Sequence, residues 1–197
     1  MLLAEELVLV AVDADRGRHG TGARPALNAC LAGLLVAELT LDGGDGPVLA
    51  AAAEVAAARG PKTKAILSHM DRGLRHRLGQ GTWDAVAAGL VAAGILGPAT
   101  GGVRPSHPVL DEAARDGVVA RLREAAATTG PLDVRTGLVL SMCGPAGLLE
   151  VVAPARAGRR AARSRIDHGL DGTAYEALAK TVRVLLVEDQ AAAAVVG

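Results

Sequence analysis

The chain of 197 residues is half hydrophobic but almost without aromatic side chains, with one Trp, one Tyr and no Phe. Its formal net charge is zero, and Cys30 and Cys143 are its two cysteines. This composition excludes an intrinsically disordered chain and a disulfide-rich scaffold, and neutrality argues against a protein that coats nucleic acid. The length fits a single compact domain over residues 1–197, with a core of Leu, Val and Ala.

The hydrophobic pattern is helical along most of the chain, and no segment alternates as a strand would. Pro25 favours the start of a helix. The run that follows it, 27–41, is so apolar that only Asn28 and Glu38 are strongly polar in it, which predicts a central helix. Thr82 is a candidate cap for a later helix. The expected helical segments are 3–10, 27–41, 48–58, 62–78, 83–96, 108–128, 132–143, 145–152, 156–168 and 173–187.

Residues 97–108 are expected to form a loop or, at most, a stunted β-hairpin, and the apolar tail 191–196 is expected to dock on the core. The N-terminus lacks the basic residues of a signal peptide, and no apolar run has the hydropathy of a membrane span. We therefore expect a mainly α, cytoplasmic protein in which amphipathic helices wrap apolar central helices.

The net charge of zero is the sum of segments with opposite net charge. Residues 1–58 have a net charge of −5, residues 59–83 of +5 and residues 154–169 of +4, while the two remaining segments have −2 each. In the first basic zone, Arg72 and Arg75 are three apart and share a helix face, where two guanidinium groups form a fork for phosphate or carboxylate oxygens.

The second basic zone is a stripe at helical spacing, typical of helices that lie on anionic membranes or bind nucleic acid. For both zones the alternative is a solvated face that pairs with acidic neighbours. The stripe consists of Arg156, Arg159, Arg160 and Arg163.

No set of residues has the spacing of a catalytic or metal site. Two cations, Arg72 and Arg75, separate His69 from His76, and positive charge opposes metal binding. The glycines of residues 17–22 do not follow the dinucleotide-binding order. We therefore expect no enzymatic activity, no cofactor and no bound metal.

Three stretches together resemble the Golgi phosphoprotein 3 family, including its actinobacterial members. They are LAEELVL (3–9) followed by DADRG (13–17), LAGLLVAELTL (31–41) and DRGLRHRL (71–78), and weaker similarity covers nearly the whole chain. The resemblance implies a helical domain that binds phosphatidylinositol 4-phosphate at a membrane surface and acts as a peripheral adaptor rather than an enzyme.

The resemblance also implies a head-group pocket. In the family it joins a Trp in the loop before the central helix, an Arg within that helix and two Arg three apart on the basic helix. Arg72 and Arg75 match the last pair, whereas Ala32 stands at the central-helix Arg and Ala23 lies near the Trp position, with Arg24 beside it. Further basic residues that we expect to face a membrane are Lys62, Lys64 and Arg77.

A cation near an anionic surface contributes about 1 kcal/mol, so Arg72 and Arg75 alone would give about 2 kcal/mol, or roughly 30-fold. The other cations would raise this affinity if they face the same way. Without aromatic anchors, such binding is electrostatic and sensitive to salt.

The expected partners are anionic phospholipid head groups at the inner face of the cell membrane, with membrane-protein tails as further candidates. No nucleic acid is expected. Residues 97–106 are short where the family has a hairpin used in oligomerisation, which predicts a monomer or a weak oligomer. Two alternatives stay open: an adaptor module that binds acidic protein tails and has lost lipid binding, and a nucleic-acid binder that uses the second basic zone.

Overall fold

In the computed structural model of this chain, residues 1–12, 24–41, 45–60, 62–100 and 106–196 are described, with side chains at all of them except 24, 25 and 188–196. Within these residues the chain forms ten α-helices, one short 3-10 helix (η1) and no sheet, which confirms the mainly α class. The helices are α1 (Leu3–Ala11), α2 (Arg24–Thr40), α3 (Pro47–Arg59), α4 (Thr63–Leu78), α5 (Thr82–Ala92), α6 (Glu112–Ala127), α7 (Val134–Cys143), α8 (Leu149–Val152), η1 (Arg156–Gly158), α9 (Arg159–His168) and α10 (Glu176–Val196).

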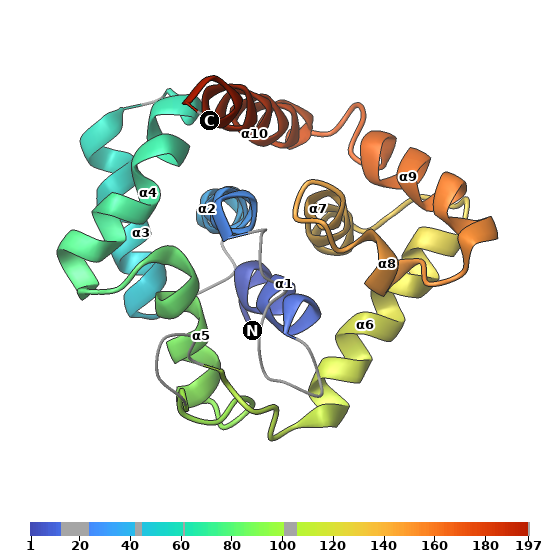
Figure 1. Cartoon of the computed structure of the whole chain (residues 1–197), viewed down its shortest axis with the longest axis horizontal. Helices are drawn as coiled ribbons and strands as arrows, with labels where there is room; N and C mark the ends of the chain where they lie inside the picture. Colours follow the sequence, from blue (N-terminus) through green and yellow to red (C-terminus); the bar gives the residue numbers. More distant parts are fainter. Residues whose placement is uncertain (13–23, 42–44, 61, 101–105, 197) are drawn as a thin grey trace.

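Three helices, α1, α2 and α7, lie at the centre of the molecule, and the others surround them (Figure 1). The central helix α2 contacts α1, α3, α4, α5, α7 and α10. Its residues Leu31, Leu34 and Leu35 are fully buried, as are nearly all side chains of α1 and α7. These segments are apolar on every side, so burial all round is the arrangement their sequences favour. The expected central helices wrapped by amphipathic ones are confirmed.

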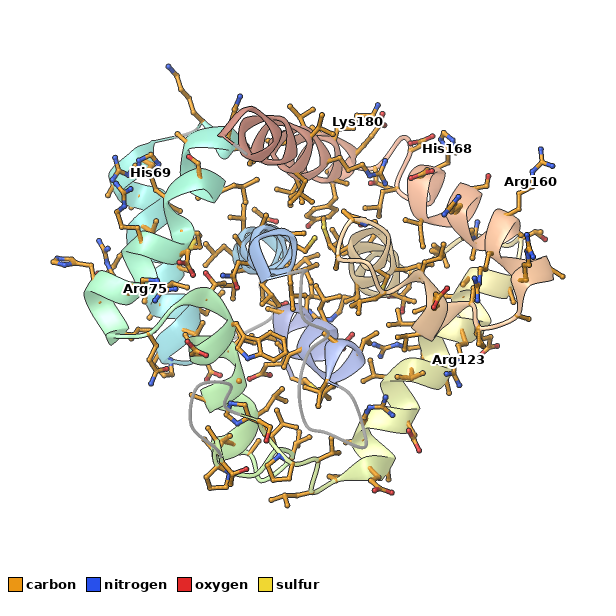
Figure 2. The ribbon with its side chains drawn as sticks, viewed as in Figure 1. His69, Arg75, Arg123, Arg160, His168 and Lys180 are labelled. Carbon is orange, nitrogen blue, oxygen red and sulfur yellow. The ribbon has the colours of Figure 1, made fainter. Side chains whose placement is uncertain are left out.

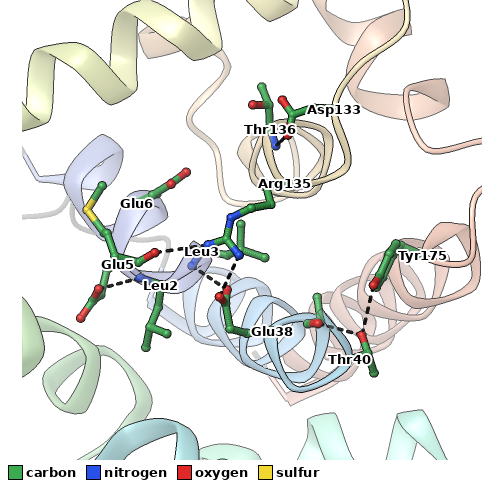
Figure 3. Close-up of polar contacts among 12 residues, drawn as sticks. Leu2, Leu3, Glu5, Glu6, Glu38, Thr40, Asp133, Arg135, Thr136 and Tyr175 are labelled. Carbon is green, nitrogen blue, oxygen red and sulfur yellow. Dashed lines mark hydrogen bonds and ion pairs between the residues drawn. The ribbon is translucent and has the colours of Figure 1, made fainter. Parts of the chain in front are cut away.

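The contacts of Glu38 explain why a strongly polar side chain occurs in the apolar helix α2 at the centre of the fold (Figure 3). Its side chain has no exposed surface, and Oε1 accepts a hydrogen bond from Arg135 Nη1 at 2.9 Å. Its other oxygen accepts the backbone N–H of Leu3 at 2.9 Å, and Arg135 donates to the carbonyl oxygen of Met1 at 3.2 Å. One carboxylate on α2 therefore satisfies a free N–H at the start of α1 and pairs with the Arg135 side chain in the first turn of α7.

The segment after α5 forms the remnant of a hairpin. Leu96 bridges Val109, and Thr100 bridges Ser106, both antiparallel, while residues 101–105 lie outside the described residues. The predicted helix over 83–96 was too long, because the chain leaves the helix at Gly94, whose φ of 72° is in the left-handed region. This turn brings Leu96 into the hairpin instead.

Other local predictions also need correction. Thr82 does not cap α5; it is the first residue of that helix, and a carboxylate from α4 accepts its N–H. The predicted helix 145–152 is reduced to α8, because Gly147 has a φ of 76°. The predicted arginine stripe is broken, because Arg156 lies in η1 and α9 begins only at Arg159.

The helix α10 continues to residue 196. The predicted docking of the tail 191–196 concerns side chains that lie outside the described residues. The single domain over 1–197 stays a prediction.

Candidate functional site

The basic helix α4 supplies most of the predicted site residues. It begins after Lys62, which is exposed, and ends at Gly79, whose φ of 70° is in the left-handed conformation that glycine adopts readily. One face of α4 is buried against α3, α2, α5 and α10. The apolar residues of that face are Ile66, Leu67, Met70 and Leu74. The basic residues are left on the outer surface of the helix, as the amphipathic pattern requires.

Arg72 and Arg75 both lie exposed on α4, but their surroundings differ. Arg72 makes no hydrogen bond or ion pair with any residue that the structure describes. Arg75 donates from Nε to Asp71 Oδ2, one turn earlier, at 2.9 Å, while 60% of its side chain stays exposed. The hydrogen bond and the charge of Asp71 raise the pKa of the Arg75 guanidinium. Figure 2 shows Arg75 at the side of the molecule formed by α3, α4 and α5.

Asp71 holds α2, α4 and α5 together. Its Oδ1 accepts the backbone N–H of Thr82 at 2.8 Å and the hydroxyl of the same residue at 3.0 Å, which satisfies a free donor at the start of α5. The side chain of Asn28 on α2 donates to the same oxygen at 3.4 Å. Partial burial favours a higher pKa, but the hydrogen bonds from Thr82 and Arg75 outweigh it and hold the pKa of Asp71 below its ordinary value.

A cavity of about 480 Å³ opens beside Arg75, between the end of α4, the outer face of α5 and the base of the hairpin. Its polar side chains are those of Arg75, Gln80, Asp84 and His107, and Gly79 and Gly81 contribute backbone. The Nδ1 of His107 lies 3.1 Å from the carbonyl oxygen of Gly97. The volume is in the range of small-ligand sites. One guanidinium, one carboxylate, an amide and an imidazole can together bind a polar ligand through both donors and acceptors.

The remaining predicted cations are placed differently from one another. Lys62 and Lys64 are exposed at the start of α4, at the opposite end of the helix from the Arg75 cavity. Arg77 is directed toward α3, where its Nε donates to Glu54 at 2.8 Å, and only 28% of its side chain is exposed. Arg24 is the first residue of α2, but its side chain lies outside the described part.

Sequence reasoning missed several residues of this region. It did not anticipate that Asp71 joins three helices, or that Gln80, Asp84 and His107 share a cavity with Arg75. A signal for Asp71 was present, because it is the one acidic residue of the basic zone 59–83. The cavity gave no local signal, because its residues come from three separate elements.

A family model described as Golgi phosphoprotein 3 (GPP34) matches residues 3–188. The chain belongs to the Golgi phosphoprotein 3 family. A search of curated proteins gives no match. In this member of the Golgi phosphoprotein 3 family, Ala32, at the position where the resemblance places a head-group Arg, is buried within α2 with 2% exposure. Ala23, near the expected Trp, lies outside the described residues.

Among the described helices, none combines the length and the apolar character needed to cross a membrane. Three or more His, Cys, Asp or Glu side chains do not gather in a metal-binding arrangement anywhere in the described ranges.

Proposed function

We propose that this chain is a peripheral membrane protein that binds anionic phospholipid head groups through α4, without catalysing a reaction. The observation that carries the proposal is the pair Arg72 and Arg75, exposed on one helix, of which Arg75 lines a cavity of about 480 Å³, in a chain of the Golgi phosphoprotein 3 family. In this proposal the cavity admits one head group, and Arg72 and Arg75 bind its phosphate oxygens. The head group implied by the family resemblance is that of phosphatidylinositol 4-phosphate.

The role proposed for each cation follows from its contacts. Arg72 has no carboxylate to compete with a lipid phosphate among the described residues, so it contributes the full effect of one cation, about 1 kcal/mol. Arg75 must exchange Asp71 for the ligand, and it contributes less. Lys62 and Lys64 add long-range attraction to the membrane surface, whereas Arg77 adds little because Glu54 neutralises it. Arg24 is proposed to supplement the pocket from the start of α2.

Co-sedimentation with vesicles tests the proposal. Vesicles of phosphatidylcholine alone, with added phosphatidylserine, and with added phosphatidylinositol 4-phosphate are compared at low and at raised salt. We expect binding to the anionic vesicles, with the strongest binding to the phosphoinositide, and weakening of binding as salt screens the charges. Equal binding to neutral and anionic vesicles at low salt would refute binding through anionic head groups and leave the adaptor alternative in its place.

Two double variants locate the binding surface. Arg72→Ala with Arg75→Ala is expected to lower vesicle affinity by up to roughly 30-fold, which corresponds to about 2 kcal/mol. The matched control is Arg160→Ala with Arg163→Ala, which removes two exposed arginines from α9. It is expected to change vesicle affinity less than about twofold. Circular dichroism of each variant confirms that the fold is retained.

A further inference from the structure

A second cavity shares no lining residue with the Arg75 cavity and lies in a groove between α9 and α10. Its volume is about 470 Å³, and residues of the loop between α7 and α8 line part of it. The floor is apolar and is formed by Leu149, Ile166 and Leu186, and the exposed Val187 lies beside it. Arg163, Asp167 and Arg183 stand at its rim. A polar rim around an apolar floor is the usual composition of a binding groove.

The arginines of this region fall into two groups. Three of them are occupied within the fold: Arg159 pairs with Glu150 at 2.9 Å, Arg183 donates to the carbonyl of Ile166 at 2.7 Å, and Arg165 donates to a backbone carbonyl. The other three, Arg156, Arg160 and Arg163, are exposed and form no hydrogen bond or ion pair within the described ranges. Of these, Arg160 and Arg163 share a face of α9 with Asp167, because the three follow one another at spacings of three and four residues.

The apolar part of the groove is also open. Val187 on α10 is 66% exposed and lines the cavity, while Val184, one turn earlier, is 51% exposed and lies outside it. Exposed aliphatic side chains beside unpaired guanidinium groups form a surface that is complementary to a ligand with aliphatic and acidic groups together.

We propose that the α9–α10 groove binds an acidic, amphipathic peptide segment of a partner protein. Aliphatic side chains of the segment would cover Val187 and the floor, and its carboxylates would pair with Arg160 and Arg163. Asp167 favours a peptide over a phosphate ligand. Its Oδ1 lies 3.8 Å from Arg183 Nη1, so the charge of the carboxylate is already paired within the rim. Its oxygens can still accept a hydrogen bond from a peptide N–H, which a phosphate does not offer.

This surface is separate from the one proposed for lipid. Figure 1 shows α4 and α9 at opposite sides of the molecule, and Figure 2 shows Arg75 and Arg160 on these two sides. A membrane bound at α4 thus leaves the groove accessible to a partner. The proposal does not depend on lipid binding and has its own test.

The test uses the full chain and an array of synthetic peptides of two to three helical turns in length. Leucine positions are kept constant, and the remaining positions are all Glu, all Lys or all Ser. We expect selective binding of the Glu–Leu peptides. In fluorescence anisotropy with the best of them, Arg163→Glu and Val187→Asp should each lower affinity at least about tenfold. The matched controls Arg72→Glu and Val184→Asp should change affinity less than about twofold.

The proposal is overturned if Glu–Leu peptides bind no better than Ser–Leu peptides, if Lys–Leu peptides are preferred, or if Arg163→Glu leaves the affinity unchanged. Loss of vesicle or nucleic-acid binding in Arg163→Glu, with peptide binding absent, would assign the groove to one of those ligands and equally overturn it. Failure here leaves the lipid proposal intact, because that proposal is tested by Arg72 and Arg75 on vesicles.

Discussion

The buried carboxylate of Glu38 is expected to be the most sensitive polar position in the fold. In Glu38→Ala, the guanidinium of Arg135 loses its partner, and the N–H of Leu3 loses its acceptor in a buried place. Removing one partner of a buried ion pair costs about 3–5 kcal/mol. Because 37% of the Arg135 side chain is exposed and can be hydrated, we expect the lower end, about 3 kcal/mol. For a chain of this length that lowers Tm by about 6–12 °C.

Urea unfolding followed by circular dichroism measures this loss. Glu38→Gln keeps one oxygen as an acceptor and should lose less, about 1–2 kcal/mol. The matched control is Glu54→Ala, which breaks a pair whose acid is 67% exposed, and it should stay within about 0.5 kcal/mol of the wild type. A loss below about 1 kcal/mol in Glu38→Ala would show that this carboxylate does not join α1 and α7 to α2.

Three further predictions concern the core and the α4 region. In the folded protein the pKa of Asp71 is held below its unfolded value of 3.8. The stabilising effect of this carboxylate is therefore present above pH 3.8 and disappears as pH falls through the folded pKa. In urea unfolding, the stability difference between wild type and Asp71→Asn should be largest near neutral pH and should disappear as pH falls below 3.8. A Cβ at Gly73 would overlap Val55, so Gly73→Ala should destabilise by about 1–2 kcal/mol in thermal unfolding, and much of that loss should vanish in a Val55→Ala background. Burial raises the pKa of Cys30 to about 12 and that of Cys143 further, so a thiol reagent at pH 8 should modify neither in the folded protein and both in urea.

Much of the fold follows from helical periodicity in the sequence. The all-round apolar run 27–41 predicted the central α2, and the amphipathic pattern of 62–78 predicted α4 to within one residue. The errors occur where a single glycine conformation or a distant side chain decides the boundary. Gly94 ends α5 early through a left-handed turn, and sequence alone does not say which glycine adopts that conformation.

Only the part of the candidate site that lies on one helix was predictable from the sequence. The spacing of Arg72 and Arg75 places both on one helix face, and both are exposed in the structure, while their role in binding stays a prediction. The partner of Arg75 was not predicted, because Asp71 is positioned by Thr82, eleven residues away on another helix. Long-range contacts of this kind depend on how helices pack, and the period of one helix carries no information about them.

The way in which Asp71 divides its contacts leaves the paired Arg75 available to the proposed lipid site. Thr82 is bound by Oδ1, whereas Arg75 is bound by Oδ2. Arg75 can therefore move to a phosphate without disturbing the contact that holds the start of α5. An exposed pair of this kind contributes only about 0–1 kcal/mol, which a charge-assisted bidentate contact with phosphate offsets. Arg77 differs, because its Nε pairs with Glu54 on the neighbouring helix α3 and 28% of its side chain is exposed. Position relative to the fold, rather than charge alone, thus separates the arginines available to a ligand from those directed toward a neighbouring helix.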